Sequence, residues 1–200
     1  MKRGLIAVSL MFASSAAFAQ PPAAGQTLTV VTSIQRAYGT MKTNLNQAAE
    51  KVPDADYGSK PSTMPEMRTY GQLFAHIAQS QFGTCAIVKK VPNPMMGRQL
   101  ETELKTKAEL VKALADSFTF CDDAYSGLTD ANAADVLMQG RGEITRAAAL
   151  MNNVVHDNEM AGTAYVYMRN KGLVPPSTEN APMRGGAGGG ARGAGGGRGR

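Results

Sequence analysis

Segment 156–176 constrains the fold most strongly because it contains a sharply defined helix end. Its residues can continue a helix through Lys171, and Gly172 then favours a stop because glycine adopts the left-handed backbone at least cost. Two consecutive prolines follow and prevent the helix from resuming. Within this helix His156 and Met160 lie one turn apart on the same face, where two metal ligands would be expected. The identity of residue 160 therefore decides much of the functional argument.

The sequence also predicts a helix over residues 107–127. Thr106 and Glu109 have the spacing of a capping box, which marks a helix start. The apolar residues that follow recur at steps of four, four, three and four, which is helical spacing. These residues are Leu110, Leu114, Phe118, Cys121 and Tyr125.

The remaining apolar spacing is also helical rather than alternating. We predict three further helices, over 27–51, over 68–90, and in a long segment that ends at 171 and is interrupted near Gly140 and Gly142. Four amphipathic helices without a convincing strand indicate an all-α protein, a four-helix bundle over residues 27–178. The two links between the first three helices are each about 15 residues long. A simple up-and-down order of helices is therefore not required.

The N-terminus has the pattern of a secretory signal peptide over residues 1–19. Two basic residues precede an apolar run that ends in Ala17-Phe18-Ala19, a small-residue cleavage site. The run is shorter than the roughly 20 apolar residues that cross a bilayer. We therefore expect a secreted or periplasmic protein that begins at Gln20, with a flexible start over 20–26 and no membrane span after cleavage.

The positive charge of the whole chain belongs mostly to its ends. Two of the 21 basic residues lie in the signal and four lie after residue 183, which leaves 15 basic against 16 acidic residues over 20–183. A near-neutral domain lacks the basic face that a nucleic-acid partner requires, so we expect none. The Gly/Ala/Arg-rich tail over 179–200 is too poor in apolar residues to order itself, and we predict that it is disordered. Its arginines suit at most weak contact with anionic envelope surfaces.

Two cysteines, Cys85 and Cys121, fall in the second and third predicted helices. An even pair in an exported protein usually forms a disulfide, so we predict that these residues join the two helices. The alternative is a pair of buried free thiols. Cys85 lies nine residues after His76, on the opposite side of the helix, and so is poorly placed to share a metal with that histidine.

Two motifs stand out, one in the second predicted helix and one in the last. They are Tyr70-Gly-Gln-Leu-Phe-Ala-His76, and His156-Asp-Asn-Glu159 with Gly162, Tyr167-Met-Arg169 and Lys171-Gly172-Leu-Val-Pro-Pro176. These motifs resemble the DinB-like superfamily, in particular its exported members, over residues from about 28 to 178. The resemblance implies a four-helix bundle and a divalent metal such as zinc or nickel, bound by one histidine of the second helix and two of the fourth, spaced His-x-x-x-His. Some relatives use this metal to activate a low-molecular-weight thiol.

The match to the family's ligand set includes His76 and His156, but Met160 occupies the third position. A thioether is a poor ligand for zinc or nickel, so three interpretations follow. The domain binds no metal tightly, or a carboxylate replaces the third histidine. Glu159 is the better candidate for that role, because Asp157 points well off the face of His156. In the third interpretation the two histidines and Met160 form a soft site for copper(I).

Two classes of function remain open. The first is an exported DinB-like domain with a degenerate metal site, which is not an efficient enzyme and acts as a binding or stress-associated module. The second is a metal-dependent transferase or hydrolase-like enzyme that uses His76, His156 and Glu159. The chain has no phosphate-binding glycine motif and no Gly-x-Ser-x-Gly nucleophile motif. The sequence therefore does not name the small molecule that either class would bind.

Overall fold

The computed structural model describes residues 28–181. The predicted signal peptide, the flexible start and all but the first three residues of the predicted tail lie outside this range. Among the described residues, none of the helices is both long and apolar enough to cross a bilayer.

The described chain is a bundle of four long helices, as predicted. The long helices are α1 (Val30–Lys51), α2 (Tyr70–Lys89), α4 (Lys107–Ser126) and α5 (Arg146–Asn170). Short elements in the connections are η1 (Asp54–Asp56), α3 (Leu100–Glu103), β1 (Val136–Gln139) and β2 (Gly142–Thr145), and α6 (Pro176–Glu179) follows α5.

Side chains define the ends of the long helices. A reciprocal capping box opens α4 at Thr106 and Glu109, where the sequence predicted one. Thr69 and Gln72 open α2 in the same way. The C-terminus of α5, which lies beside the start of α2, is capped by Lys171, and Gly172 follows with φ of 73°. The left-handed glycine that the sequence predicted at this helix end is confirmed.

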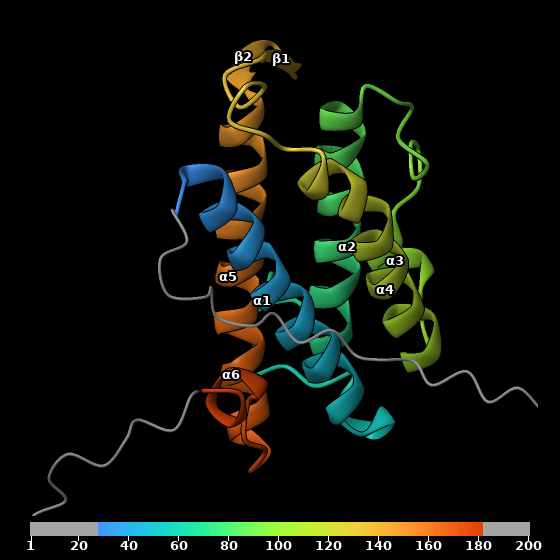
Figure 1. Ribbon diagram of the computed structural model, residues 1–200. Coiled ribbons are helices and arrows are strands. Elements are labelled where there is room, and N and C mark those ends of the chain that lie inside the picture. Colours follow the sequence, from blue (N-terminus) through green and yellow to red (C-terminus); the bar gives the residue numbers. More distant parts are fainter. Residues whose placement is uncertain (1–27, 182–200) are drawn as a thin grey trace, which may run out of the picture.

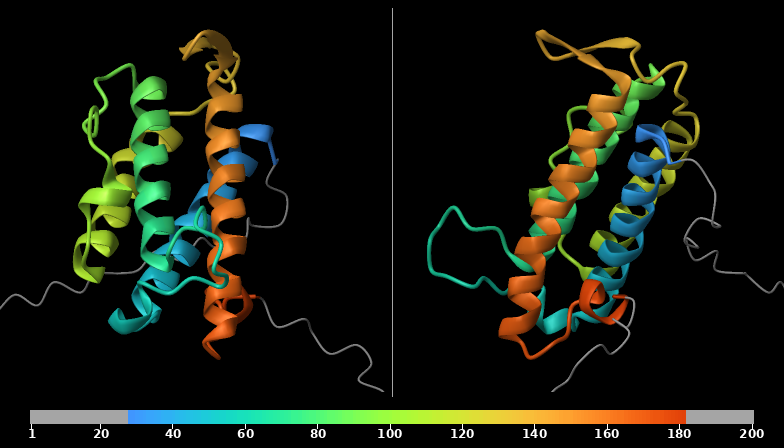
Figure 2. Two further views of the ribbon diagram at one scale, coloured as in Figure 1. Left: turned by 180° about the vertical axis from the view of Figure 1, so that it is seen from behind. Right: turned by 60° about the vertical axis from the view of Figure 1, so that its left-hand side comes forward.

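The order of the helices is not up-and-down (Figures 1 and 2). Helices α2 and α4 run parallel, since Gly71 lies beside Leu110 near their starts and Cys85 pairs with Cys121 further along. Helix α5 runs antiparallel to α2. The link over residues 90–106 therefore returns along the bundle, and α3 lies within it. This return places α3 beside the middle of α2.

Cys85 and Cys121 join α2 to α4, as predicted. Their Cα atoms are 5.3 Å apart, and both side chains are fully buried in the core. Aromatic side chains also pack between helices in this core. The rings of Tyr38 and Tyr125 stack with centroids 3.7 Å apart, which attaches α1 to α4.

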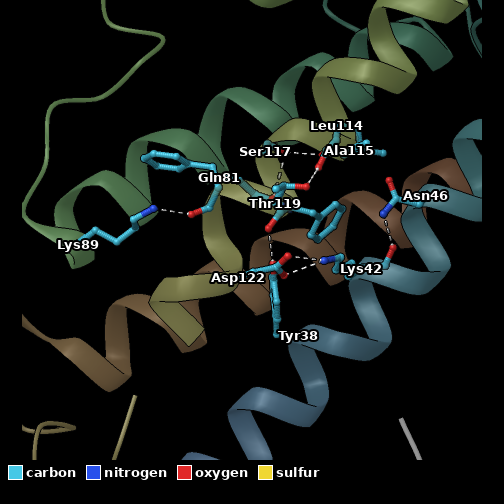
Figure 3. Close-up of polar contacts among 12 residues, drawn as sticks. Tyr38, Lys42, Asn46, Gln81, Lys89, Leu114, Ala115, Ser117, Thr119 and Asp122 are labelled. Carbon is cyan, nitrogen blue, oxygen red and sulfur yellow. Dashed lines mark hydrogen bonds and ion pairs between the residues drawn. The ribbon is translucent and has the colours of Figure 1, made fainter. Parts of the chain in front are cut away.

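Polar contacts also fix α1 against α4 (Figure 3). The single proton of the Tyr38 hydroxyl faces two acceptors, the Phe118 carbonyl at 2.7 Å and the Asp122 carboxylate at 2.9 Å. Lys42 binds the same carboxylate at 2.7 Å. The carboxylate of Asp122 therefore satisfies a phenol that is otherwise buried.

A short hairpin precedes α5, and here the expectation of no strand was wrong. β1 pairs with β2 in antiparallel register, with Leu137 opposite Ile144 and Gln139 opposite Gly142. Gly140 begins the two-residue turn with φ of 62°, which is the glycine position of a type II′ hairpin. The predicted interruption near Gly140 is therefore this turn, and α5 begins only at Arg146.

Candidate functional site

The two histidines of the chain meet between α2 and α5. The Nε2 atoms of His76 and His156 lie 3.1 Å apart, and both side chains are about one quarter exposed. His76 stands in the middle of α2, and His156 lies opposite it because α5 runs antiparallel. The sequence predicted both residues for one site, and the structure brings them together.

A carboxylate from α3 holds the other side of His76. The Nδ1 atom of His76 lies 2.8 Å from Oε1 of Glu101, and Oε2 of the same carboxylate binds Nε of Arg68 at 2.8 Å. The Tyr167 hydroxyl in turn donates to the backbone carbonyl of Arg68 at 2.6 Å. Sequence reasoning missed Glu101 because its helix is only four residues long and carries no motif.

These contacts determine the protonation of the pair. An ionised carboxylate only accepts hydrogen bonds, so Nδ1 of His76 carries the proton and Nε2 has a free lone pair. Burial lowers the pKa of His76, against the opposing effect of the hydrogen bond that the ring donates to Glu101. Burial alone would raise the pKa of Glu101, but the hydrogen bonds from Arg68 and His76 outweigh it and the pKa is lowered. A neutral His76 beside an ionised Glu101 is the result.

Asp157 is buried in the core, with Oδ1 3.9 Å from Nδ1 of His156. Its side chain is fully buried, and Gln81 donates to Oδ2 at 3.0 Å while Ser117 donates to the other end of Gln81 at 3.1 Å. Gln81 and Ser117 are drawn in Figure 3. The Oδ1 atom has no hydrogen-bond partner in the described chain, and burial raises the pKa of Asp157. This carboxyl is therefore a core group, in line with its expected direction off the face of His156.

The two residues on α5 considered for a third ligand differ in exposure. The side chain of Glu159 is exposed, whereas Met160 is half-buried and packs against the core. Within residues 28–181 no three His, Cys, Asp or Glu side chains are arranged to hold a metal ion.

The pair fits part of the metal site that the fold implies. Imidazole nitrogens bind zinc at about 2.0–2.1 Å, so two of them on one ion lie roughly 3.0–3.4 Å apart. The 3.1 Å between His76 and His156 matches this separation. A carboxylate on the far nitrogen of a ligating histidine, as Glu101 is here, is also usual at such sites. Met160 stands at the position of the third histidine in the resemblance, and a thioether does not fit a zinc or nickel site.

Comparison with known proteins agrees with this fold. A DinB-like protein from Bacillus cereus has a similar structure, with TM-score 0.60 and 16 % identity over 72 % of this chain and 95 % of that one. A conserved protein from Enterococcus faecalis matches with TM-score 0.56 and 13 % identity, over 72 % of this chain and 97 % of that one. No curated protein matches the sequence. The family model of the DinB superfamily matches residues 37–163, more than half of the chain, and the protein therefore belongs to the DinB superfamily.

Proposed function

We propose that this protein is an exported DinB-superfamily domain whose metal site is degenerate, and that it acts as a binding module rather than as an efficient metalloenzyme. The observation that carries the proposal is Met160, which stands one helical turn after His156 and packs against the core. A thioether in that place provides neither the charge nor the basicity of a third histidine.

The nearby carboxylates support this proposal because two of them are already engaged. Glu101 uses one oxygen for His76 and the other for Arg68. Asp157 is buried against Gln81. A metal held by His76 and His156 alone would have only two protein ligands, and its affinity would be low.

Metal content tests this proposal directly. The protein is purified without a histidine tag, equilibrated with equimolar zinc or nickel, desalted and assayed by elemental mass spectrometry beside a Met160→His variant. We expect well under one ion per chain in the unmodified protein and close to one ion in Met160→His. Failure of both proteins to retain metal would show that the pair of His76 and His156 is not a former metal site.

A metal-dependent transferase or hydrolase-like enzyme is the second candidate. The contact between Glu101 and His76 favours it, because a carboxylate commonly orients a histidine that binds a metal. In this case Glu159 would complete the ligand set from the exposed face of α5. Near-stoichiometric zinc or nickel in the unmodified protein, lost in both His156→Ala and Glu159→Gln, would establish this candidate and refute the first.

Retention of copper(I) tests the interpretation that His76, His156 and Met160 form a soft metal site. A site that used the Met160 sulfur would retain copper(I) under reducing conditions and lose it in Met160→Leu, which preserves the packing volume. Equal copper content in the two proteins would exclude Met160 as a ligand.

A further inference from the structure

A hollow of about 610 Å³ lies between the hairpin and the end of α2, far along the bundle from the histidines. Apolar side chains that are exposed to solvent line it. Met96 is 77 % exposed and Met138 is 60 % exposed, and Val91 and Val136 are exposed beside them. Apolar side chains gathered at one concave place mark an interaction site more often than apolar side chains scattered singly.

The backbone of β1 has a free edge at this hollow. Residues that flank a two-residue turn form a hydrogen-bonded pair, and such pairs alternate along the hairpin. The observed register therefore directs the N–H and C=O groups of Leu137 and Gln139 to β2, and those of Val136 and Met138 away from it. Within the described chain, Val136 and Met138 make no other backbone hydrogen bond.

The hollow lies on this free side of the hairpin. Residues of β1 line it together with residues of α2 and of the segment after α2, whereas β2 contributes none. Figure 1 shows the hairpin above α5, next to the end of α2. A strand edge with unused donors and acceptors is a template for an added strand.

The charge at the hollow indicates what such a strand would carry. Lys90 is the charged residue among the lining side chains, and it has no ion-pair partner within residues 28–181. It stands at the end of α2 with φ of 56°, in the left-handed conformation, and its side chain is exposed. A carboxylate bound in the hollow would pair with this ammonium group.

We propose that this hollow is a peptide-binding site, in which an extended peptide adds to β1 as a third strand. Alternate apolar side chains of the peptide enter the hollow beside Val136 and Met138. A carboxylate of the peptide, at its C-terminus or on a side chain, pairs with Lys90. The site does not involve His76 or His156, so it stands independently of the metal proposal.

Fluorescence anisotropy with designed peptides tests the site. The probe is a labelled six-residue peptide of alternating valine and threonine with a free C-terminal carboxylate. Two matched probes carry N-methyl groups on the amides of either the valines or the threonines, because alternate amides of an extended strand face opposite edges. We expect one methylated probe to bind like the parent and the other to bind at least tenfold more weakly.

Three protein variants locate the binding. Met138→Pro removes a backbone N–H that faces away from β2, so the hairpin pairing stays intact and the affinity should fall at least tenfold. Met138→Thr keeps this N–H and serves as the matched control, with a smaller loss. Lys90→Gln should abolish the preference for the free carboxylate over the amidated peptide. If Met138→Pro fails to fold by circular dichroism, the methylated pair of probes still decides the question.

Three results would overturn the proposal. The first is no binding of any probe up to about 1 mM, the limit of weak association. The second is equal binding of the two methylated probes, which would mean apolar contact without strand addition. The third is a dimer of the unmodified protein in sedimentation velocity that Met138→Pro dissociates, because the edge would then belong to a second copy of the chain.

Discussion

His76 and His156 are 80 residues apart in sequence, yet their Nε2 atoms lie 3.1 Å apart across two antiparallel helices. One imidazole therefore donates to the other, and only one nitrogen of the facing pair holds a proton. Because neutral His76 has one N–H and uses it at Nδ1 to donate to Glu101, the proton between the two Nε2 atoms belongs to His156. Changes at Glu101 should therefore be visible at both rings.

Replacement of Glu101 by glutamine should lower the pKa of His76 still further. The carboxylate is the main group that favours the protonated ring, whereas burial and Arg68 oppose protonation and remain in the variant. Proton NMR titration of the imidazole signals measures this, and assignment is simple because the chain has two histidines. Glu103→Gln is the matched control, because Glu103 lies on the same short helix but pairs with Arg98. A rise of the pKa in Glu101→Gln would contradict the assigned contact.

Acid should destabilise the protein through the same two residues. The pKa of His76 is lowered from 6.5 and that of Glu101 from 4.5, so in both windows the unfolded chain binds more protons than the folded chain. The free energy of unfolding then falls as the pH drops, first below 6.5 and again below 4.5. Urea unfolding across this range measures the effect. In His76→Gln the decline below pH 6.5 should become smaller, and an unchanged slope there would assign it to other groups.

Asp157→Asn should stabilise the protein at neutral pH by about 1 kcal/mol. The carboxyl is buried, and one of its oxygens has no hydrogen-bond partner in the described chain. Asparagine keeps an acceptor for Gln81 and removes the penalty for burying a charge. Because burial raises the pKa of Asp157, the gain should shrink as the pH falls and the acid becomes neutral. Urea unfolding at two pH values tests this.

The outcome for Asp122→Asn provides the comparison. Asp122 is half-exposed and paired with Lys42, so its amide should be neutral or destabilising. Destabilisation of both variants by similar amounts would mean that the charge of Asp157 is compensated by a group other than Gln81.

Removal of the cysteine pair should cost about 4 kcal/mol, from the loop entropy of a 36-residue separation. The test is urea unfolding of the protein and of a Cys85→Ala, Cys121→Ala double variant, each with and without reductant. Reductant should lower the stability of the unmodified protein and leave the variant unchanged. If reductant affects neither protein, the two thiols are not bonded in solution.

The sequence predicted the elements that have strong periodicity and clear ends. The capping box at Thr106 and the glycine stop at Gly172 mark boundaries that local physics alone decides. His76 and His156 could be assigned to one site only through resemblance to a family, because nothing in the spacing of two distant helices specifies their contact. The exposed position of Glu159 likewise depends on how α5 rotates against its neighbours.

The parts that sequence reasoning missed are short. Each strand of the hairpin has four residues, too few for alternation to be distinguished from helical spacing, and tertiary contacts with α2 and α5 support the hairpin. Glu101 lies on one turn of helix inside a link, and its partner His76 is 25 residues away. The contact of Glu101 with His76 depends on the path of that link, and no local sequence pattern predicts this path.

The return of the link over 90–106 has an evolutionary consequence. Because α2 and α4 are parallel, the link between them must run back along the bundle. This link contains Glu101, which contacts His76. Substitutions on the buried faces of α2 or α5 disturb a packed core, whereas most of the connecting segment, apart from the buried Leu100, is exposed and tolerates change more readily. A descendant could therefore exchange the acidic partner of His76 by remodelling this segment alone, and so acquire a different chemistry on an unchanged scaffold.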